Sequence, residues 1–290
     1  MQVNKFVQLH IIILLWGFTP VLGKLISLQA LDLVWYRLLI SGITIYLFAR
    51  YKGIRLHVSS KSLLEILFMG FIVGIHWYTF YHAIKVSNVS VTMAGFSTIT
   101  LFASLLQPLI LKKKFFWGDL IYGVVIGGGL LIILNFEKFY AKGIFYAIIS
   151  SFTAAFFGIY NGKLIKQHDS VTITLIEFIG AFITLTVLIL FMGENPNVFL
   201  IPEMSDWIYL LILSILCTTV AFTWSIYILK QFSPLTVIIT NNLEPIYGIV
   251  FSVLIFGQSE YMSMQFYIGA AIILIGVFTY PFIQKKWNIT

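Results

Sequence analysis

Charged residues and cysteine are both scarce in this sequence of 290 residues. Asp, Glu, Lys and Arg together make up 10% of the chain, against about 25% in ordinary soluble domains. A soluble fold of this length needs a polar surface over its core, so the composition argues against that class. The single cysteine, Cys217, rules out a disulfide framework, and no Cys/His spacing suggests a metal. We therefore expect no metal site and no cofactor.

Apolar and aromatic residues fill most of the chain instead. They make up 60% of it, in runs long enough to cross a bilayer as helices of about 20 residues. Barrel strands would be half that length, with alternating polarity. The sequence therefore predicts an all-α integral membrane protein with ten transmembrane helices. The predicted spans are residues 7–28, 33–51, 63–84, 89–111, 116–135, 142–162, 171–192, 206–229, 234–256 and 264–283.

Basic residues are unevenly divided between the loops at the two ends of the predicted spans. Thirteen Lys and Arg residues fall at the end that carries the N-terminus, and four fall at the other end. Because cytoplasmic loops carry the excess of Lys and Arg, both termini are predicted to be cytoplasmic, in a multi-pass protein of a bacterial-type inner (plasma) membrane. The net charge of +7 is scattered over short loops and forms no stripe, so we expect no nucleic-acid partner.

The two halves of the chain show a weak similarity. A shift of 145 residues places the span that begins at Val89 on the span that begins at Pro234. Internal repeats are a feature of many transporter folds, and a repeat of five spans has to insert upside down the second time. We therefore expect two inverted five-helix repeats, residues 1–138 and residues 139–290.

Short motifs are spread over the predicted spans of both halves. They are Trp16-Gly17 with Pro20 and Lys24 in the first span, Arg37 in the second, residues 83–87 (AIKVS) at the end of the third, Glu244-Pro245 and Phe256-Gly257 in the ninth, and Gly269 and Gly276 in the tenth. In these motifs the whole chain resembles the EamA-type transporters of the drug/metabolite transporter superfamily. The resemblance implies ten helices in two inverted halves around a central cavity, and transport of amino acids, other metabolites or drug-like compounds, often as export.

Glu244 lies near the middle of the ninth span, where a carboxylate is energetically costly and usually faces a cavity or a partner. Pro245 cannot donate a hydrogen bond to the carbonyl of Asn241, so we expect a kink beside the acid. Asn241, Glu244 and Tyr247 share a helix face. We interpret this face as a substrate or proton site; the alternative is a protonated Glu244 that bonds a neighbouring helix. Family members often carry a second proline in the fourth span, where this sequence has Thr100.

Other candidate substrate-binding residues are a histidine and several aromatics inside the spans. His76 either holds a substrate carboxylate or bonds a neighbouring helix. Trp16, Trp77, Trp224 and Tyr227 lie away from the interfacial positions where Trp and Tyr are usually enriched. As a set they favour a pocket for flat or cationic substrates, although helix packing is the alternative for each one.

Pro20, Arg37 and Glu177 are candidates for the conformational machinery. Pro20 is expected to break the first span, or to act as a packing kink only. Arg37 and Glu177 occupy matching positions when the halves are shifted by 140, and we predict both to be gate or helix-pairing residues. Arg37 is placed about one turn from the outer end, within reach of the interface. Small residues for close helix packing mark the fifth and tenth spans, at Gly123 and Gly127 and at Gly269 and Gly276.

These features predict a secondary transporter that moves a small metabolite by alternating access, without ATPase machinery. The site is expected between the broken first and ninth helices and the third and eighth. The expected partners are the small-molecule substrate and the lipid bilayer, and the protein is a monomer or a homodimer. Two alternatives stay open: a non-transporting membrane partner or lipid-flipping subunit, and a membrane-embedded enzyme, for which the acidic residues are too isolated.

Overall fold

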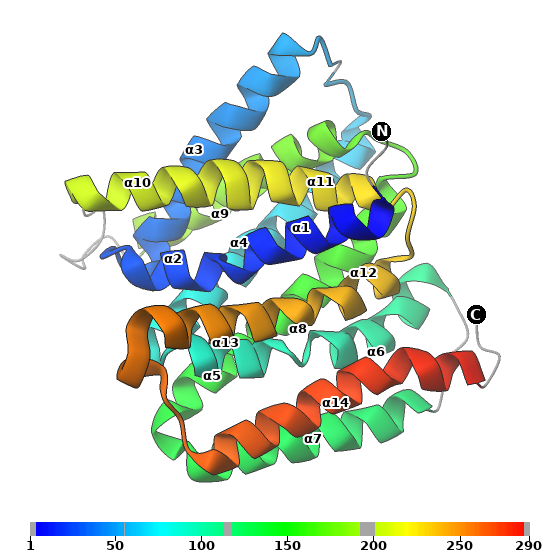
Figure 1. The fold of residues 1–290 in the computed structure, drawn as a ribbon. Helices are drawn as coiled ribbons and strands as arrows, with labels where there is room; N and C mark the ends of the chain where they lie inside the picture. The colour runs from blue at the N-terminus through cyan, green and yellow to red at the C-terminus, as the bar shows by residue number, and fades with distance from the viewer. Residues whose placement is uncertain (1–3, 55, 113–117, 192–200, 287–290) are drawn as a thin grey trace.

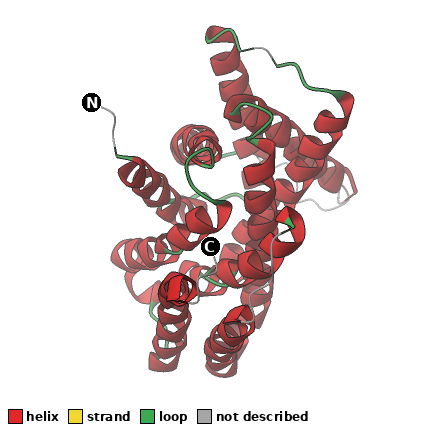
Figure 2. Ribbon diagram, turned by 90° about the vertical axis from the view of Figure 1, so that its right-hand side faces the viewer, coloured by secondary structure: helices red, strands yellow, loops and turns green. Residues whose placement is uncertain are grey.

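The computed structural model describes residues 4–54, 56–112, 118–191 and 201–286, and in these ranges the chain is helical and contains no strand (Figures 1 and 2). Side chains are not described in residues 118–123, 277 and 280–286. Three basic residues used in the orientation argument, Arg55, Lys113 and Lys114, lie outside the described residues, as do residues 192–200 of the loop after the seventh predicted span.

The first half of the chain contains five helical stretches, two of them broken. They are α1 (Lys5–Gly17) with α2 (Thr19–Leu25), α3 (Ala30–Tyr51), α4 (Ser60–Val86), α5 (Val89–Phe96) with α6 (Ile99–Leu111), and α7 (Gly118–Phe136). The proline Pro20 lies in the first turn of α2, directly after the break between α1 and α2.

The second half begins after a short 3-10 turn, η1 (Lys138–Tyr140). It also has five helical stretches, but its first is unbroken and its third contains a π-helical segment. Its stretches are α8 (Ala141–Leu164), α9 (Ser170–Phe191), α10 (Met204–Ile212) with the π-helical η2 (Leu213–Val220) and α11 (Ala221–Ile228), α12 (Pro234–Asn241) with α13 (Leu243–Phe256) and the turn η3 (Gly257–Glu260), and α14 (Met264–Lys286).

Eight helical stretches of the described residues are long and apolar enough to cross a membrane. Two shorter apolar helices, Val124–Phe136 and Met264–Gly276, lie where the fifth and tenth spans are predicted. Large apolar side chains are exposed on the outside of the bundle, which in a soluble protein would form an unusually large apolar surface. Examples are Leu47, Phe68, Leu109, Leu190 and Leu254. The all-helical, multi-pass membrane fold is confirmed, and the total of ten spans stays a prediction.

The fourth and ninth spans are broken at corresponding points. Helix α5 begins at Val89 and is followed by a break at Ser97; helix α12 begins at Pro234 and is followed by a break at Asn242. Both the starts and the breaks are 145 residues apart, the shift that the sequence comparison uses. The Asn242 amide donates a hydrogen bond to the Thr100 hydroxyl, so the two breaks touch. The broken helices of the two halves therefore meet inside the bundle.

The break in the fourth span occurs although position 100 is Thr100 and not the proline that the EamA-type resemblance implies there. The Ser97 hydroxyl donates to the Met93 carbonyl at 3.0 Å, and the Thr98 hydroxyl donates to the Gly95 carbonyl at 2.8 Å. Serine and threonine hydroxyls that bond back to helix carbonyls compete with the backbone ladder and bend helices. Ser97 and Thr98 therefore explain the break in this helix, although position 100 carries no proline.

Helices α7 and α14 pack side by side at one edge of the bundle (Figure 1). A Cβ atom added to Gly129 would lie 2.8 Å from the Gly269 carbonyl oxygen, and one added to Gly269 would lie 2.7 Å from the Gly129 oxygen. Gly276 also faces α7, so the predicted packing role of Gly269 and Gly276 is confirmed. No described atom lies within 4 Å of a Cβ atom added to Gly127, so its predicted role is wrong: the contact with α14 lies two residues further along the helix, at Gly129. Gly123 lies in the part of α7 without described side chains.

Candidate functional site

A cavity of about 90 Å³ lies inside the bundle, between helices of both halves. About 10–15 Å³ of such space is enough for one water molecule, so the cavity has room for several. Helices α1 to α6 line it from the first half and α8, α11, α12 and α13 from the second. Because both halves form its walls, a movement of one half against the other changes its shape.

Five strongly polar residues line the cavity, each from a different helix. They are Arg37 of α3, His76 of α4, Asn161 of α8, Asn241 of α12 and Glu244 of α13. Glu244 follows the break at the start of α13 and is 7% exposed. It has no ion-pair partner among the described residues. A carboxylate that borders an open space without a fixed partner is available for a ligand or a proton.

Six aromatic rings form part of the apolar wall. They are Trp16, Trp77, Phe80, Phe96, Phe157 and Phe222. The rings also contact one another: the Trp77 and Phe222 centroids lie 5.6 Å apart, and those of Phe157 and Phe222 lie 5.9 Å apart. Rings at such separations pack favourably and present flat faces. The cavity thus combines charged and amide groups with an aromatic lining.

Arg37 is held inside the bundle and is 3% exposed. Its guanidinium lies 4.0 Å from the centroid of the Trp77 ring, Nε donates to the Thr218 hydroxyl at 2.6 Å, and Nη1 donates to the Tyr81 hydroxyl at 3.0 Å. The expectation that its charge reaches the membrane interface is therefore wrong. A ring face and two hydroxyls stabilise the guanidinium at depth, so the side chain does not have to extend to water.

The π-helical segment η2 positions the partner of Arg37. In η2 the Thr218 hydroxyl donates to the Leu213 carbonyl, five residues back, at 2.6 Å. Its oxygen is then oriented to accept from Arg37. The Ser41 hydroxyl, one turn after Arg37 in α3, donates to the Ser214 carbonyl of η2 at 2.9 Å. Such π-helical turns occur often at functional sites, and this one fixes α3 beside the cavity.

His76 lines the cavity and also bonds the neighbouring helix. Its Nδ1 lies 3.0 Å from the Ser150 carbonyl oxygen of α8, and a carbonyl only accepts, so Nδ1 carries a proton. Nε2 is then the ring nitrogen left for other partners. The described residues contain no group of three or more His, Cys, Asp and Glu side chains that could hold a metal.

Three aromatic residues predicted to bind substrate lie outside the cavity lining. Trp224 Nε1 donates to Gln8 of α1 at 3.1 Å, and the Tyr247 hydroxyl lies 2.7 Å from His10 Nε2, also of α1. Tyr227 is 44% exposed. The first two residues connect α1 to α11 and α13, and the third lies on the outside of the bundle.

Glu177 is fully buried on α9 and joins it to α8. The Asn161 amide donates to Glu177 Oε2 at 3.3 Å, and Glu177 Oε1 has no hydrogen-bond partner in the described part of the chain. Asn161 itself lines the cavity, so Glu177 lies directly behind the cavity wall. Pro245 is buried in the first turn of α13, next to Glu244.

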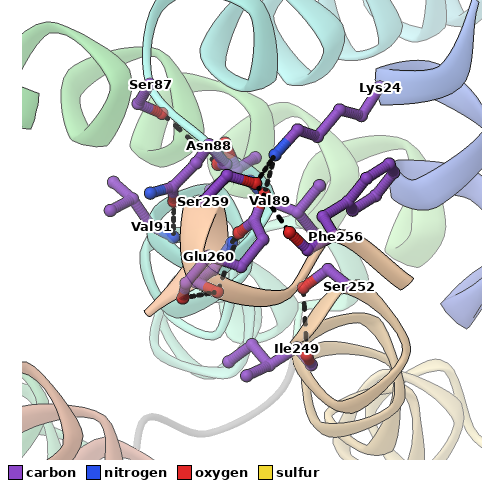
Figure 3. A network of polar contacts seen from close by, with 12 residues as sticks. Lys24, Ser87, Asn88, Val89, Val91, Ile249, Ser252, Phe256, Ser259 and Glu260 are labelled. Atoms are coloured by element: carbon purple, nitrogen blue, oxygen red, sulfur yellow. Dashed lines mark hydrogen bonds and ion pairs between the residues drawn. The ribbon is translucent and has the colours of Figure 1, made fainter. Parts of the chain in front are cut away.

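A polar network closes the end of the bundle where α2 ends and α5 begins (Figure 3). Lys24 Nζ lies 2.7 Å from Glu260 Oε1, and the fully buried Glu260 carboxylate also accepts from the backbone N–H groups of Val89, at 3.1 Å, and Ser90, at 2.8 Å. We call Lys24, Val89, Ser90 and Glu260 the Lys24–Glu260 network. It ties the first, fourth and ninth helical stretches together.

The cavity extends away from this network. Its lining residues reach Asn161, Leu229 and Pro234, near the loops that follow α8 and α11. None of the residues of the Lys24–Glu260 network lines it. At the network's end, the Ser27 hydroxyl also donates to Asp206 of α10 at 2.6 Å. One end of the bundle is therefore joined by polar contacts between the halves, and the cavity lies toward the other.

The model of one protein family, the EamA-like transporter family, matches the chain twice, over residues 7–135 and residues 141–280. The chain belongs to the EamA-like transporter family. Two matches in tandem show a two-repeat architecture, as the EamA-type resemblance implies, and place the protein in the drug/metabolite transporter superfamily. The site described above is therefore the central cavity of an EamA-like membrane protein.

The fold is similar to that of solved structures. Of the chains that match, one is described as a crystal structure of a protein and covers 98% of this chain and 98% of its own, with a TM-score of 0.69 and 14% sequence identity. At that identity the similarity shows the fold alone. A search of curated proteins finds no match.

The EamA-like sequence indicated part of this cavity and missed part of it. Trp16, His76, Trp77, Asn241 and Glu244 were candidates from the sequence, and the structure brings them to one space. Several further lining residues were not singled out: Thr19, Phe96, Asn161, Phe157 and Phe222. An asparagine inside an apolar span is a signal that could have been used for Asn161. For the phenylalanines there was none, because lipid and a cavity wall both accept apolar rings.

Proposed function

We propose that this protein is a secondary transporter that exports a small metabolite, an amino acid or a drug-like compound, across the inner membrane by alternating access. The observation that carries the proposal is a cavity between the two halves of a membrane bundle, lined by a guanidinium, a carboxylate and aromatic rings. Buried polar groups of this kind inside a membrane protein usually lie on a substrate or ion pathway. Because the family is one of transporters, we assign no reaction and no cofactor to the cavity.

In this proposal Trp16, His76, Trp77, Asn241 and Glu244 contact the substrate. Glu244 is the proton carrier if export is coupled to protons. Trp224, Tyr227 and Tyr247 contact it only after a movement of α1, α11 or α13, since they do not line the cavity in this conformation. Substrate binding at broken helices is the arrangement that transporters with internal repeats commonly use.

Alternating access requires that the two repeats move against each other. We place their boundary between residues 138 and 139, and the interval between the two family matches supports this position. The matching starts and breaks of α5 and α12 support a common plan for the halves, and we propose that the second is inverted. Helix α1 begins and helix α14 ends at the right-hand side of Figure 1, which supports termini on one side of the membrane.

With cytoplasmic termini, the Lys24–Glu260 network closes the outer end and the cavity lies toward the cytoplasm. Export would then begin from this conformation, by entry of the substrate from inside. Pro20 and Pro245, beside the breaks in the first and ninth stretches, mark the points about which the helix ends turn. Arg37 and Glu177 hold α3 to η2 and α9 to α8 during this movement.

The test begins with the substrate. Metabolites retained and exported by cells with and without the protein are compared, and the compound that differs is then measured in proteoliposomes with and without a pH gradient. The first prediction is that Glu244→Gln loses the flux driven by the pH gradient, because the amide cannot exchange a proton. Glu203→Gln is the matched control, since Glu203 is exposed and its side chain caps no helix.

Two results would contradict the proposal. If no metabolite differs between the two cell populations and none crosses the proteoliposome membrane, the transporter assignment fails. If Glu244→Gln keeps its full gradient-driven flux, transport stands and Glu244 is not the proton carrier.

A further inference from the structure

The guanidinium of Arg37 is a buried cation with most of its donors unused. An arginine has five N–H donors. Nε donates to Thr218 and Nη1 donates to Tyr81, and Arg37 makes no other hydrogen bond with the described residues. The second hydrogen of Nη1 and both hydrogens of Nη2 are left. They belong to a side chain that is 3% exposed and lines the cavity.

Arg37 has no carboxylate partner within the described part of the protein. The ion pair found there is Lys24–Glu260, which lies at the end of the bundle and does not line the cavity. Glu244 lines the same cavity, yet it is not paired with Arg37. Buried charges are normally paired and hydrogen-bonded, because leaving water is costly for an ion. An anion that pairs with Arg37 would therefore have to lie in the cavity.

Neighbouring groups orient this cation firmly and leave it charged. The Trp77 ring covers the guanidinium at 4.0 Å, and Thr218 is itself oriented by its bond to Leu213 in the π-helical η2. Both partner groups are neutral, so they stabilise the guanidinium without cancelling its charge. A planar guanidinium presents parallel N–H donors that match the two oxygens of one carboxylate. The held geometry favours a carboxylate over a spherical anion.

We infer that Arg37 is the anion-binding residue of the cavity and takes the carboxylate of the substrate. This inference rests on the proposed transport function and narrows the substrate class. The acceptors lie on other helices: Glu244 on α13, and the side-chain oxygens of Asn161 and Asn241, which accept no hydrogen bond from the described residues. They complement a cationic group on the same substrate. The aromatic wall complements an apolar or flat body. The substrate class is thus a small zwitterion with an apolar side group.

The binding test uses the purified full-length protein in detergent and two matched pairs of probes. The pairs are L-phenylalanine with L-phenylalaninamide, and benzoate with benzamide; within each pair only the carboxylate is changed. A ligand that binds the native state raises the unfolding temperature. The second prediction is that both carboxylates raise it and that the amides do not.

Two substitutions at position 37 and one control assign the effect to the guanidinium. Arg37→Gln should weaken carboxylate binding by about 10- to 100-fold, the scale of hydrogen bonds to a charged group. Arg37→Lys keeps the charge without the fork and should weaken it by about tenfold. It also provides the result if Arg37→Gln does not fold. Arg50→Gln, an exposed arginine on the same helix, should leave binding unchanged.

The inference is overturned if carboxylate and amide act alike, including no response to either. It is also overturned if the Arg37 variants bind carboxylates as the unchanged protein does. Flux measurements separate this failure from failure of the proposed function. Suppose that the metabolite identified from cells carries no carboxylate and that Arg37→Lys transports it as fast as the unchanged protein does. The proposed transport function then stands, and the anion site at Arg37 is rejected. If the protein binds carboxylates but transports no metabolite, the anion site at Arg37 stands and the proposed transport function is rejected.

Discussion

The position of the Tyr81 ring depends on a glycine of another helix. A Cβ atom on Gly23 of α2 would lie inside van der Waals contact of the Tyr81 ring, which itself is fully buried. The Tyr81 hydroxyl accepts the hydrogen bond from Arg37. Gly23 therefore acts on the cavity through Tyr81.

We predict that Gly23→Ala lowers the stability by about 1–3 kcal/mol, the usual effect of added volume in a packed interior. The displaced ring should also weaken carboxylate binding at Arg37. Thermal unfolding in detergent, with and without L-phenylalanine, measures both effects. Gly42→Ala on α3 is the control, because no atom of the described residues lies within 4 Å of its added methyl group. Equal unfolding temperatures for the two variants would show that the Tyr81 ring moves aside without a loss of stability, which would contradict the prediction.

At the scale of helical elements, the contact between the breaks of the fourth and ninth stretches is the most specific feature. The Asn242 amide donates to the Thr100 hydroxyl, and also to the Ile238 carbonyl at 3.1 Å, so one side chain caps its own helix and reaches the other half. Breaks need such partners because each interrupted turn leaves backbone groups unpaired. The contact couples the two repeats where both helices are weakest.

A double-mutant cycle measures this coupling. We predict that Thr100→Val and Asn242→Leu are each destabilising and that their effects are not additive, with a coupling of about 0.5–3 kcal/mol, as for residues that share a hydrogen bond. Chemical unfolding of the two single variants and the double variant gives this value. Thr44→Val with Asn242→Leu is the control, since the Thr44 hydroxyl donates within its own helix. Additive effects in both cycles would mean that the breaks form independently.

For the whole molecule, the Lys24–Glu260 network favours the conformation that is closed at its end. Lys24 belongs to the first helical stretch, and Glu260 follows the ninth, so the network joins the two halves (Figure 3). The Lys24 side chain is 26% exposed and the Glu260 side chain is fully buried, so water screens the pair from one side and offsets part of its attraction; we take its contribution as about 1 kcal/mol. A free energy of that size, present in the closed conformation only, changes the ratio of closed to open molecules by up to about fivefold.

We predict that Lys24→Ala increases access to the cavity from the end that the network closes. The chain has one cysteine, so Cys217→Ser provides a cysteine-free background, and Thr19→Cys places a reporter in the cavity wall. Labelling by a membrane-impermeant maleimide added at the predicted outer side should become faster, up to about fivefold. Lys138→Ala removes an exposed lysine from the same end as a control. Equal labelling rates would show that the ion pair does not gate the cavity.

Helices, spans and the kink at Pro245 could be predicted from the sequence because they are properties of single segments. In lipid, each segment must satisfy its own backbone hydrogen bonds, so a long apolar run is sufficient to indicate a helix. Glu244 is likewise recognisable as a charge that is costly inside a membrane span. Pro245 lacks the backbone N–H that would bond the carbonyl four residues earlier, so its kink is also a local property. These statements need no knowledge of neighbouring helices. The inverted order of the repeats and the orientation in the membrane stay predictions.

Only the tertiary structure decided which faces of those helices form the cavity. A membrane helix is apolar both where it meets lipid and where it meets another helix, so apolar periodicity does not separate Phe157, in the wall, from Phe152, which is 43% exposed. Arg37 is the clearest case. From the sequence it lies near a helix end with water in reach, whereas Trp77, Tyr81 and Thr218, from two other helical stretches, hold it at depth. Those partners are 40 to 181 residues away in the chain, and packing alone brings them together.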